Sequence, residues 1–143
     1  MGRGFTLECK IINGIGVIPA YVSPAQGELS PQERVSLLKE RRRLYCCFQS
    51  SVYATSINRQ TAEELHARPA LKDGKEVEGV YEIDILLPGN ILIPDKLVRV
   101  SDSNIDLSIG MDLIGHGDLA FSTRDGKPLI SFTVPHKGPI DLA

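Results

Sequence analysis

Three Asx-Gly dipeptides, Asn13-Gly14, Asp73-Gly74 and Asp125-Gly126, most constrain how this chain folds. Asn-Gly and Asp-Gly are favoured in two-residue β-hairpin turns, because both central positions of such a turn adopt positive φ. Each pair stands beside segments rich in Val, Ile, Leu or Phe. We therefore predict three antiparallel hairpins, one near each end of the chain and one in the middle.

The segments around these turns have the composition of β-strands. The first hairpin is expected over residues 5–22, and the second leads into an alternating strand at residues 76–86. A further strand is predicted at residues 91–100, and the last hairpin joins LAFST to LISFTV. The nearly continuous apolar run LYCCF, residues 44–48, is typical of a strand buried on both faces. We expect it at the centre of the domain.

One helix is strongly indicated between the first hairpin and this central strand. Ser30 and Glu33 form the S-x-x-E pattern of a capping box, and Pro31 suits the first helical position. Cations gather toward residue 43, where the helix dipole favours positive charge. We predict a helix from Pro31 to about residue 43, with shorter helices at residues 58–66 and just after Gly110.

Composition excludes several classes of protein. A chain of 143 residues fits one domain, and a net charge of -2 gives no general affinity for nucleic acid or anionic membranes. No segment approaches the ~20 apolar residues of a membrane span, and the N-terminal residues lack the apolar run of a signal peptide. Three cysteines cannot all pair within one chain. We expect a cytoplasmic protein with reduced thiols, and neither a membrane nor a nucleic acid as partner.

Three pieces of the sequence resemble, in order and spacing, the retropepsin-like aspartic proteases of retroviruses and bacteria. In that family an apolar strand leads into Asp-Thr/Ser-Gly-Ala and then Thr-x-Ile. Here residues 44–48 lead into Gln49-Ser50-Ser51-Val52 and then Thr55-Ser56-Ile57. IGMDLI, residues 109–114, matches the family's Ile-Gly-Met-Asp motif. GDLAFS, residues 117–122, matches the Gly-Asp segment that follows this motif in the family.

The resemblance covers about two thirds of the chain, residues 44–134. It implies a mainly β fold, a closed antiparallel retropepsin-like domain that occupies residues 1–143. The segment of about residues 23–43, which contains the predicted helix, is longer than the family's usual step between its first strands. We interpret it as an inserted helical segment near the mouth of the cleft, where it would cover the cleft or supply a contact surface. One or two short helices complete the expected fold.

The loop after the central strand differs from the family's sequence at the positions of the catalytic residues. A retropepsin is a homodimer in which each subunit supplies one aspartate, and the two carboxylates share a proton and activate a water. Gln49 carries no proton that titrates near neutral pH. Ser51 and Val52 also replace the family's Gly and Ala. The resemblance therefore implies a catalytically inactive pseudo-protease, with no catalytic residue, that binds a peptide, a protein or a small ligand.

Ligand-binding residues are predicted in the degenerate loop, in the hairpin that matches the family's flap, and in a cationic cluster: Gln49, Ser50, Ser51, Asp73, Gly74, Arg41, Arg42 and Arg43. Two alternatives stay open. One is an active aspartic endopeptidase that uses another acid, such as Asp73 or Asp112, although Asp112 is expected to accept hydrogen bonds from backbone amides. The other is a regulatory module that sequesters an anionic ligand at the arginine cluster.

Neither a cofactor nor a metal ion is expected. His116-Gly117-Asp118 offers two possible ligands without a third at helical spacing. A thiol nucleophile is disfavoured because Cys46 and Cys47 lie in the most apolar strand, where a thiolate is poorly stabilised.

The resemblance also implies an assembly. In the family the C-terminal strand and the active-site loop both form the subunit interface. We therefore expect a homodimer with a peptide or protein ligand in the inter-subunit cleft. We further expect ISFTVP, residues 130–135, to pair across a two-fold axis.

Overall fold

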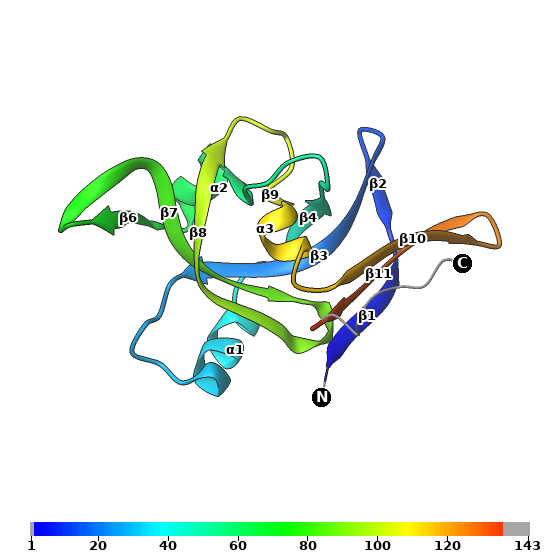
Figure 1. Ribbon diagram of the computed structural model, residues 1–143, viewed down its shortest axis with the longest axis horizontal. Helices are drawn as coiled ribbons and strands as arrows, with labels where there is room; N and C mark the ends of the chain where they lie inside the picture. Colours follow the sequence, from blue (N-terminus) through cyan, green and yellow to red (C-terminus); the bar gives the residue numbers. More distant parts are fainter. Residues whose placement is uncertain (1, 136–143) are drawn as a thin grey trace.

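The structure is a computed structural model, and it describes residues 2–135. It is mainly β, with short helices between the strands (Figure 1). The strands are β1 (Arg3–Glu8), β2 (Lys10–Ile12), β3 (Ile15–Pro24), β4 (Leu44–Phe48), β5 (Ser56–Asn58), β6 (Arg68–Lys72), β7 (Lys75–Leu87), β8 (Ile91–Ser101), β9 (Leu107–Ile109), β10 (Asp118–Arg124) and β11 (Lys127–Val134). The helices are α1 (Pro31–Lys39), α2 (Arg59–Glu64) and α3 (Met111–Ile114), and a 3-10 turn, η1 (Pro88–Asn90), joins β7 to β8.

A closed ring of strands forms the body of the molecule. The strands β3, β4, β9, β5, β8 and β7 pair in that order, and β3 also pairs with β7, so the sheet returns on itself. Most of these pairings are antiparallel, whereas β4 with β9 and β5 with β8 are parallel. A second, three-stranded sheet in the order β1-β11-β10 lies beside the ring (Figure 1). The predicted closed, mainly antiparallel β architecture is confirmed.

The central strand β4 lies between β3 and β9, as its apolar sequence predicts. Cys46 is fully buried in the main core, and Cys47 is buried in a smaller cluster on the other side. Phe48, at the end of the strand, lies 5.4 Å from Phe132 between ring centroids. This contact joins the barrel to the three-stranded sheet.

All three Asx-Gly pairs are hairpin turns with positive φ at both positions. The first hairpin is shorter than predicted, however, because the chain changes sheets at Cys9. Only β2 pairs with β3, whereas β1 pairs with β11 from the other end of the chain. The Cys9 N–H donates to the carbonyl of Pro128 over 3.0 Å, which fixes this change of partner. Side-chain pattern cannot reveal such a break, because both segments are strands.

Helix α1 begins as predicted and ends earlier. Ser30 Oγ accepts from the Glu33 N–H, and Glu33 Oε1 accepts from the Ser30 N–H, each over 3.2 Å, so the capping box is formed. The helix ends at Lys39 and not near residue 43. Residues 41–43 instead connect α1 to β4, since the chain must leave the helix to enter the barrel. The second helix is likewise shorter than residues 58–66, and the short helix after Gly110 is α3.

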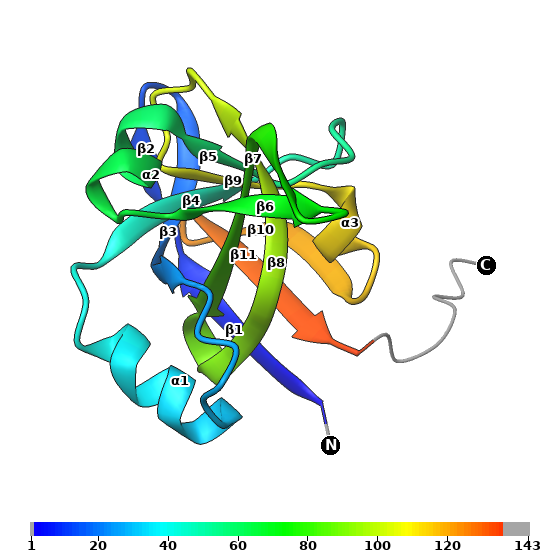
Figure 2. The same cartoon turned by 90° about the vertical axis from the view of Figure 1, so that its left-hand side faces the viewer.

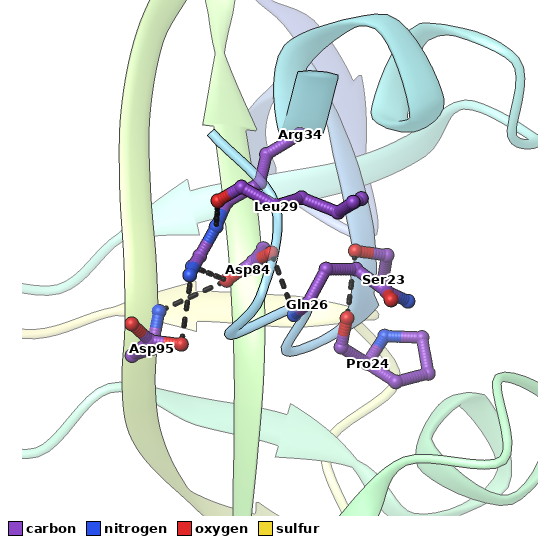
Figure 3. A network of polar contacts seen from close by, with 7 residues as sticks. All are labelled: Ser23, Pro24, Gln26, Leu29, Arg34, Asp84 and Asp95. Carbon is purple, nitrogen blue, oxygen red and sulfur yellow. Dashed lines mark hydrogen bonds and ion pairs between the residues drawn. The ribbon is translucent and has the colours of Figure 1, made fainter. Parts of the chain in front are cut away.

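Buried polar contacts attach α1 to the barrel (Figure 3). Arg34 is only 7% exposed, and its Nη1 donates to Asp84 Oδ1 and to Asp95 Oδ1, each over 3.1 Å. Asp84 is fully buried and also accepts from the backbone N–H groups of Asp95, at 2.9 Å, and Gln26, at 3.1 Å. Arg34 Nε donates to the carbonyl of Leu29. Every charge in this network has a partner, which burial of charge requires.

The insertion does not lie beside the loop that follows β4. Helix α1 packs against β3, β7 and β8, and it lies at the opposite end of the barrel from α2 in both views (Figures 1 and 2). The connection from α1 enters the start of β4, whereas the loop of interest leaves its end. Within one chain, the length of β4 therefore separates the inserted segment from that loop.

Candidate functional site

The loop of residues 49–55 leaves the barrel between two buried strands. The Gln49 N–H donates to the carbonyl of Ile109 over 2.8 Å, which continues the pairing of β4 with β9 by one residue. Two amides at the start of α3 donate to the carbonyls of Val52 and Tyr53 over 2.8 and 2.9 Å. The short helix thus fixes the backbone of this loop from one side.

Gly110 is the residue that allows α3 to approach so closely. A Cβ at this position would lie 2.5 Å from the carbonyl oxygen of Tyr53 and 2.8 Å from the carbonyl carbon of Ala54. Both are backbone atoms, which cannot rotate aside as a side chain can. The glycine of the IGMD motif is therefore a requirement of this contact.

Thr55 and Asp112 support the same loop from beneath. Thr55 is fully buried, and its hydroxyl donates to Asp112 Oδ1 over 2.6 Å and accepts from the Gly110 N–H over 3.1 Å. Asp112 Oδ2 accepts from the Thr55 N–H over 3.1 Å and pairs with Lys96 Nζ at 2.8 Å. Burial alone would raise the pKa of Asp112, but the hydrogen bonds from Lys96 and Thr55 outweigh burial and hold that pKa below its ordinary value.

Asp112 is therefore a structural carboxylate. Both of its oxygens are occupied, and its side chain is 11% exposed. A group that is ionised and fully hydrogen-bonded has neither a proton to give nor a free lone pair directed at a substrate. The geometry matches the expectation that Asp112 accepts from a backbone amide, and it gives no support to catalysis by this acid.

The predicted loop residues are accessible. Gln49 is half-buried, and Ser50 and Ser51 are exposed. Within residues 2–135 their side chains make no hydrogen bond, so an amide and two hydroxyls remain able to donate to and accept from a ligand. No carboxylate occurs among residues 49–55. The loop offers hydrogen bonding and lacks an acid.

The predicted flap residues are not brought to this loop within one chain. Asp73 and Gly74 are exposed at the tip of the hairpin formed by β6 and β7. That hairpin projects from the barrel, away from the loop that follows the β4 arrow (Figure 1). A site that includes both regions needs a second copy of the chain or a ligand long enough to span them.

The predicted arginine cluster is divided between two cavities. Arg41 and Arg42 line one of about 220 Å³, where Arg42 pairs with Glu64 at 3.3 Å and both of these side chains are largely exposed. Arg43 instead lines a second cavity of about 220 Å³ with Lys39 and Tyr21. The cluster precedes β4 and Gln49 follows it, so the length of a five-residue strand, about 17 Å, separates the two. The cationic residues and the loop form different surfaces.

Two apolar cavities were not predicted from the sequence. One, of about 560 Å³, lies between the start of α1 and the start of β8 and is lined by Val35, Ile91 and Val134 among others. The other, of about 380 Å³, lies between the hairpins β2–β3 and β10–β11, and both Phe48 and Phe121 line it. Strand alternation places such residues on the inner face of a sheet, but it does not reveal which of them stay uncovered.

The cysteines are free thiols buried in the protein. Burial, and secondarily Glu8, raises the pKa of Cys9, and burial, with Cys47 adjacent, raises the pKa of Cys46. These thiols are protonated and poorly suited to attack a substrate. Within residues 2–135 no three His, Cys, Asp or Glu side chains gather as a metal site would require. No helix in that part of the chain is long and apolar enough to span a membrane.

Comparisons with known proteins bear on the fold. No protein-family model matches the sequence, and no curated protein shows significant similarity to it. Among solved structures, the chain is similar to the crystal structure of a retropepsin-like aspartic protease from Rickettsia conorii, with a TM-score of 0.53 and 11% identity over 94% of this chain and 96% of that one. It also matches the retroviral protease-like domain of Ddi1 from Leishmania major, with a TM-score of 0.48 and 17% identity over 80% of this chain and 91% of that one. With its closed barrel and the loop between β4 and β5, this chain has a retropepsin-like fold.

Proposed function

We propose that the chain is a non-catalytic, homodimeric retropepsin-like module that binds an extended peptide or protein segment in a cleft between its subunits. The observation that carries this proposal is the loop after β4, where Gln49-Ser50-Ser51 stands in place of an acid-containing triplet. Hydrolysis by an aspartic protease needs two carboxylates that share one proton. A pair of glutamines supplies none.

The acids nearest in sequence pattern to a catalytic role are not placed for peptide hydrolysis at this loop. Asp112 is hydrogen-bonded to Thr55 and ion-paired with Lys96, and Asp73 is exposed at the tip of a projecting hairpin. Neither acid replaces the missing one at Gln49. The supporting contacts of the loop are nevertheless complete, from the α3 amides to the buried Thr55. A loop that keeps its framework and lacks its acid is suited to binding.

An extended peptide is the ligand class that fits best. Recognition by strand addition uses main-chain hydrogen bonds, which do not depend on a catalytic carboxylate. The Gln49 amide and the hydroxyls of Ser50 and Ser51 each donate and accept, as a peptide backbone requires. A projecting β6–β7 hairpin provides a second strand pair for such a ligand. Arg43 lines a different cavity from Arg41 and Arg42, and Arg42 is already paired with Glu64, so an anionic ligand fits less well.

Restoring the acid tests this proposal. The double variant Gln49→Asp with Ser51→Gly is compared with the native chain on a mixed peptide library from about pH 3 to pH 8. We expect no hydrolysis by the native chain, because replacing a catalytic carboxylate removes activity by several orders of magnitude. Hydrolysis by the double variant alone, blocked by a pepstatin-like inhibitor, supports both the fold and the position of Gln49.

The matched control is Gln49→Asn with Ser51→Gly, which has the shape of the restored site without its acid. Cleavage by this control, or by the native chain, would show that another residue carries the chemistry and would overturn the proposal. Binding is measured separately, as the change in NMR chemical shifts of the loop amides when library peptides are added. Shifts confined to regions outside residues 49–55 and the β6–β7 hairpin would place the ligand elsewhere.

A further inference from the structure

A groove runs between helix α1 and the η1 turn that joins β7 to β8. It consists of two cavities: the apolar one of about 560 Å³ at the start of α1, and the one of about 220 Å³ that Lys39 and Arg43 line. Asn90 lines both, so the two cavities meet at η1. No residue of the loop 49–55 lines either cavity, so the groove is a surface distinct from that loop.

One wall of the groove is a single face of α1. Gln32 and Val35 line the larger cavity, and Lys39 lines the smaller one. Positions i, i+3 and i+7 of a helix lie on the same side, so these three side chains form a row along the groove. Leu37 is on the opposite side of the helix and lines neither cavity.

Both walls are held in place by contacts within the chain. The buried ion pairs of Arg34 with Asp84 and Asp95 attach α1 to the barrel. The η1 turn lies against β1, where Gly89 has a φ of 76° and a Cβ would collide with the carbonyl oxygen of Gly4. A groove that is formed before its ligand arrives avoids part of the ordering cost of binding.

The charges that line the groove have one sign. Arg3 lines the larger cavity, Lys39 and Arg43 line the smaller one, and neither Asp nor Glu lines either of them. Within residues 2–135 none of these three cations takes part in an ion pair. The chain has 18 acidic and 16 basic side chains, so composition does not explain a groove lined by cations alone. The groove favours an acidic ligand.

The surface between the cations suits a peptide. Val35, Ile91 and Leu92 make it apolar. The side-chain amides of Gln32 and Asn90 border it and make no hydrogen bond within the described residues, so each can donate to and accept from a peptide group. A free phosphate or a nucleic acid would use the cations and leave the apolar surface uncovered. An acidic peptide with apolar side chains uses the cations, the amides and the apolar surface together.

We propose that this groove docks an extended segment of a partner protein in which about three apolar residues stand between two acidic ones. The length follows from α1. Gln32 and Lys39 are seven positions apart, which is about 10 Å along a helix, and roughly three residues of extended chain cover that distance. One acid then lies beside Lys39 and Arg43, and the other lies at the end of the groove that Arg3 lines.

This docking site goes beyond the proposed function, because it does not depend on the loop at Gln49 or on a second copy of the chain. A labelled peptide tests it by fluorescence polarisation. The probe is the capped pentapeptide Glu-Leu-Val-Leu-Glu, and the control peptide is Lys-Leu-Val-Leu-Lys. We expect the native chain to bind the acidic probe with a dissociation constant below about 1 mM, more weakly as salt is added, and not to bind the basic one.

Charge reversal tests the cationic end of the groove. Lys39→Glu with Arg43→Glu should raise the dissociation constant of the acidic probe at least tenfold, because like charges then face each other. The matched control is Arg124→Glu with Lys127→Glu, which makes the same change of charge at an exposed pair beside the β10–β11 turn. This control should leave the affinity unchanged.

A second pair of variants tests the apolar surface. Val35→Asp places a carboxylate in the middle of the groove and should also raise the dissociation constant at least tenfold. Leu37→Asp makes the same substitution on the opposite side of the same helix and should leave the affinity unchanged. Circular dichroism confirms that each variant is folded.

NMR chemical shifts locate the bound probe and separate this site from the proposed peptide cleft. We expect the acidic probe to shift amides within residues 31–39 and 86–92 and to leave those of residues 49–55 unchanged. Shifts confined to residues 49–55 would mean that the peptide occupies the loop after β4, which overturns the groove as a docking site and leaves the proposed function standing.

Three further results would overturn the proposal. Absence of saturable binding up to about 1 mM removes the docking site. Equal binding of the acidic and basic peptides removes the recognition of charge. If Val35→Asp changes the sedimentation of the chain and leaves probe binding unchanged, the groove contacts a second copy and not a partner protein. None of these results bears on hydrolysis, which the variants at Gln49 test separately.

Discussion

At the scale of single residues, Asp112 shows why an acid near the loop of residues 49–55 need not be catalytic. Its two oxygens are shared among the hydroxyl and amide of Thr55 and the ammonium of Lys96. These contacts lower the pKa of Asp112 despite its burial. The carboxylate thereby joins α3 to β8 and to the end of the loop of residues 49–55.

This arrangement predicts a pH-dependent contribution to stability. The pKa of Asp112 is lower in the folded chain than the ordinary value of about 3.9. Its stabilising effect is fully present above pH 4 and is lost as the pH falls through the lowered folded pKa. Asp112→Asn leaves one donor without an acceptor, so we expect a loss of about 2 kcal/mol in the free energy of unfolding at pH 7. The deficit should shrink toward pH 2.5.

Urea unfolding at pH 7, 4 and 2.5 measures this difference. Asp73→Asn, at the exposed hairpin tip, serves as the control and changes the free energy of unfolding by less than about 0.5 kcal/mol. A deficit for Asp112→Asn that stays constant down to pH 2.5 would contradict the role assigned to the ionised carboxylate.

At the scale of elements, local sequence predicts what local contacts determine. The three hairpin turns and the N-terminal cap of α1 are encoded within a few residues, and all four are found as expected. The end of α1 differs from the prediction, because it is determined by where β4 must enter the barrel. The buried Arg34 also escapes prediction, since an arginine on a helix normally faces water.

Some features of the candidate site likewise follow from local sequence, whereas others depend on contacts between distant segments. The loop of Gln49, Ser50 and Ser51 is accessible as predicted because its position follows from one buried strand. The proposed arginine cluster fails as a unit because sequence proximity does not make side chains converge after a helix has ended. The partners of Asp112 and the fit of Gly110 against Tyr53 depend on contacts between distant segments, which no local pattern contains.

The attachment of α1 gives a second prediction. Arg34→Met leaves Asp84 buried with a charge that only backbone amides compensate. We expect a loss of about 3 kcal/mol in the free energy of unfolding, measured by urea denaturation at pH 7. Arg42→Met is the matched control, because the pair of Arg42 with Glu64 is exposed, and it should cost less than about 1 kcal/mol. Equal effects of the two substitutions would mean that the buried network does not anchor the helix.

At the scale of the whole molecule, the closed ring and the separate three-stranded sheet have different consequences. Within residues 2–135 the ring closes on itself and only β2 and β6 lie outside it, whereas β10 of the small sheet pairs with a strand on one side alone. The resemblance identified the C-terminal strand correctly but not its neighbours, because β1 occupies the side that a partner was expected to use. Which edge stays open is a property of the complete fold.

The proposed homodimer makes thermal stability depend on protein concentration. A dimer that dissociates on unfolding is stabilised by mass action, so the midpoint of thermal unfolding should rise as the protein is concentrated from 1 to 100 micromolar. Differential scanning calorimetry of the native chain measures the shift. A native midpoint that is constant across this range would argue against a dimer of the folded chain.

The pairing of β1 with β11 has a consequence for the order in which the protein is made. Phe5 is synthesised before its partner in the sheet, Phe132, and the strands of the barrel lie between the two in the sequence. At roughly 5–20 residues per second, β1 leaves the ribosome on the order of ten seconds before β11 exists. The barrel strands can pair during that interval, but β1 has no strand to join. The three-stranded sheet is therefore completed only after β11 has been translated, and until then β1 is an unpaired strand of the nascent chain.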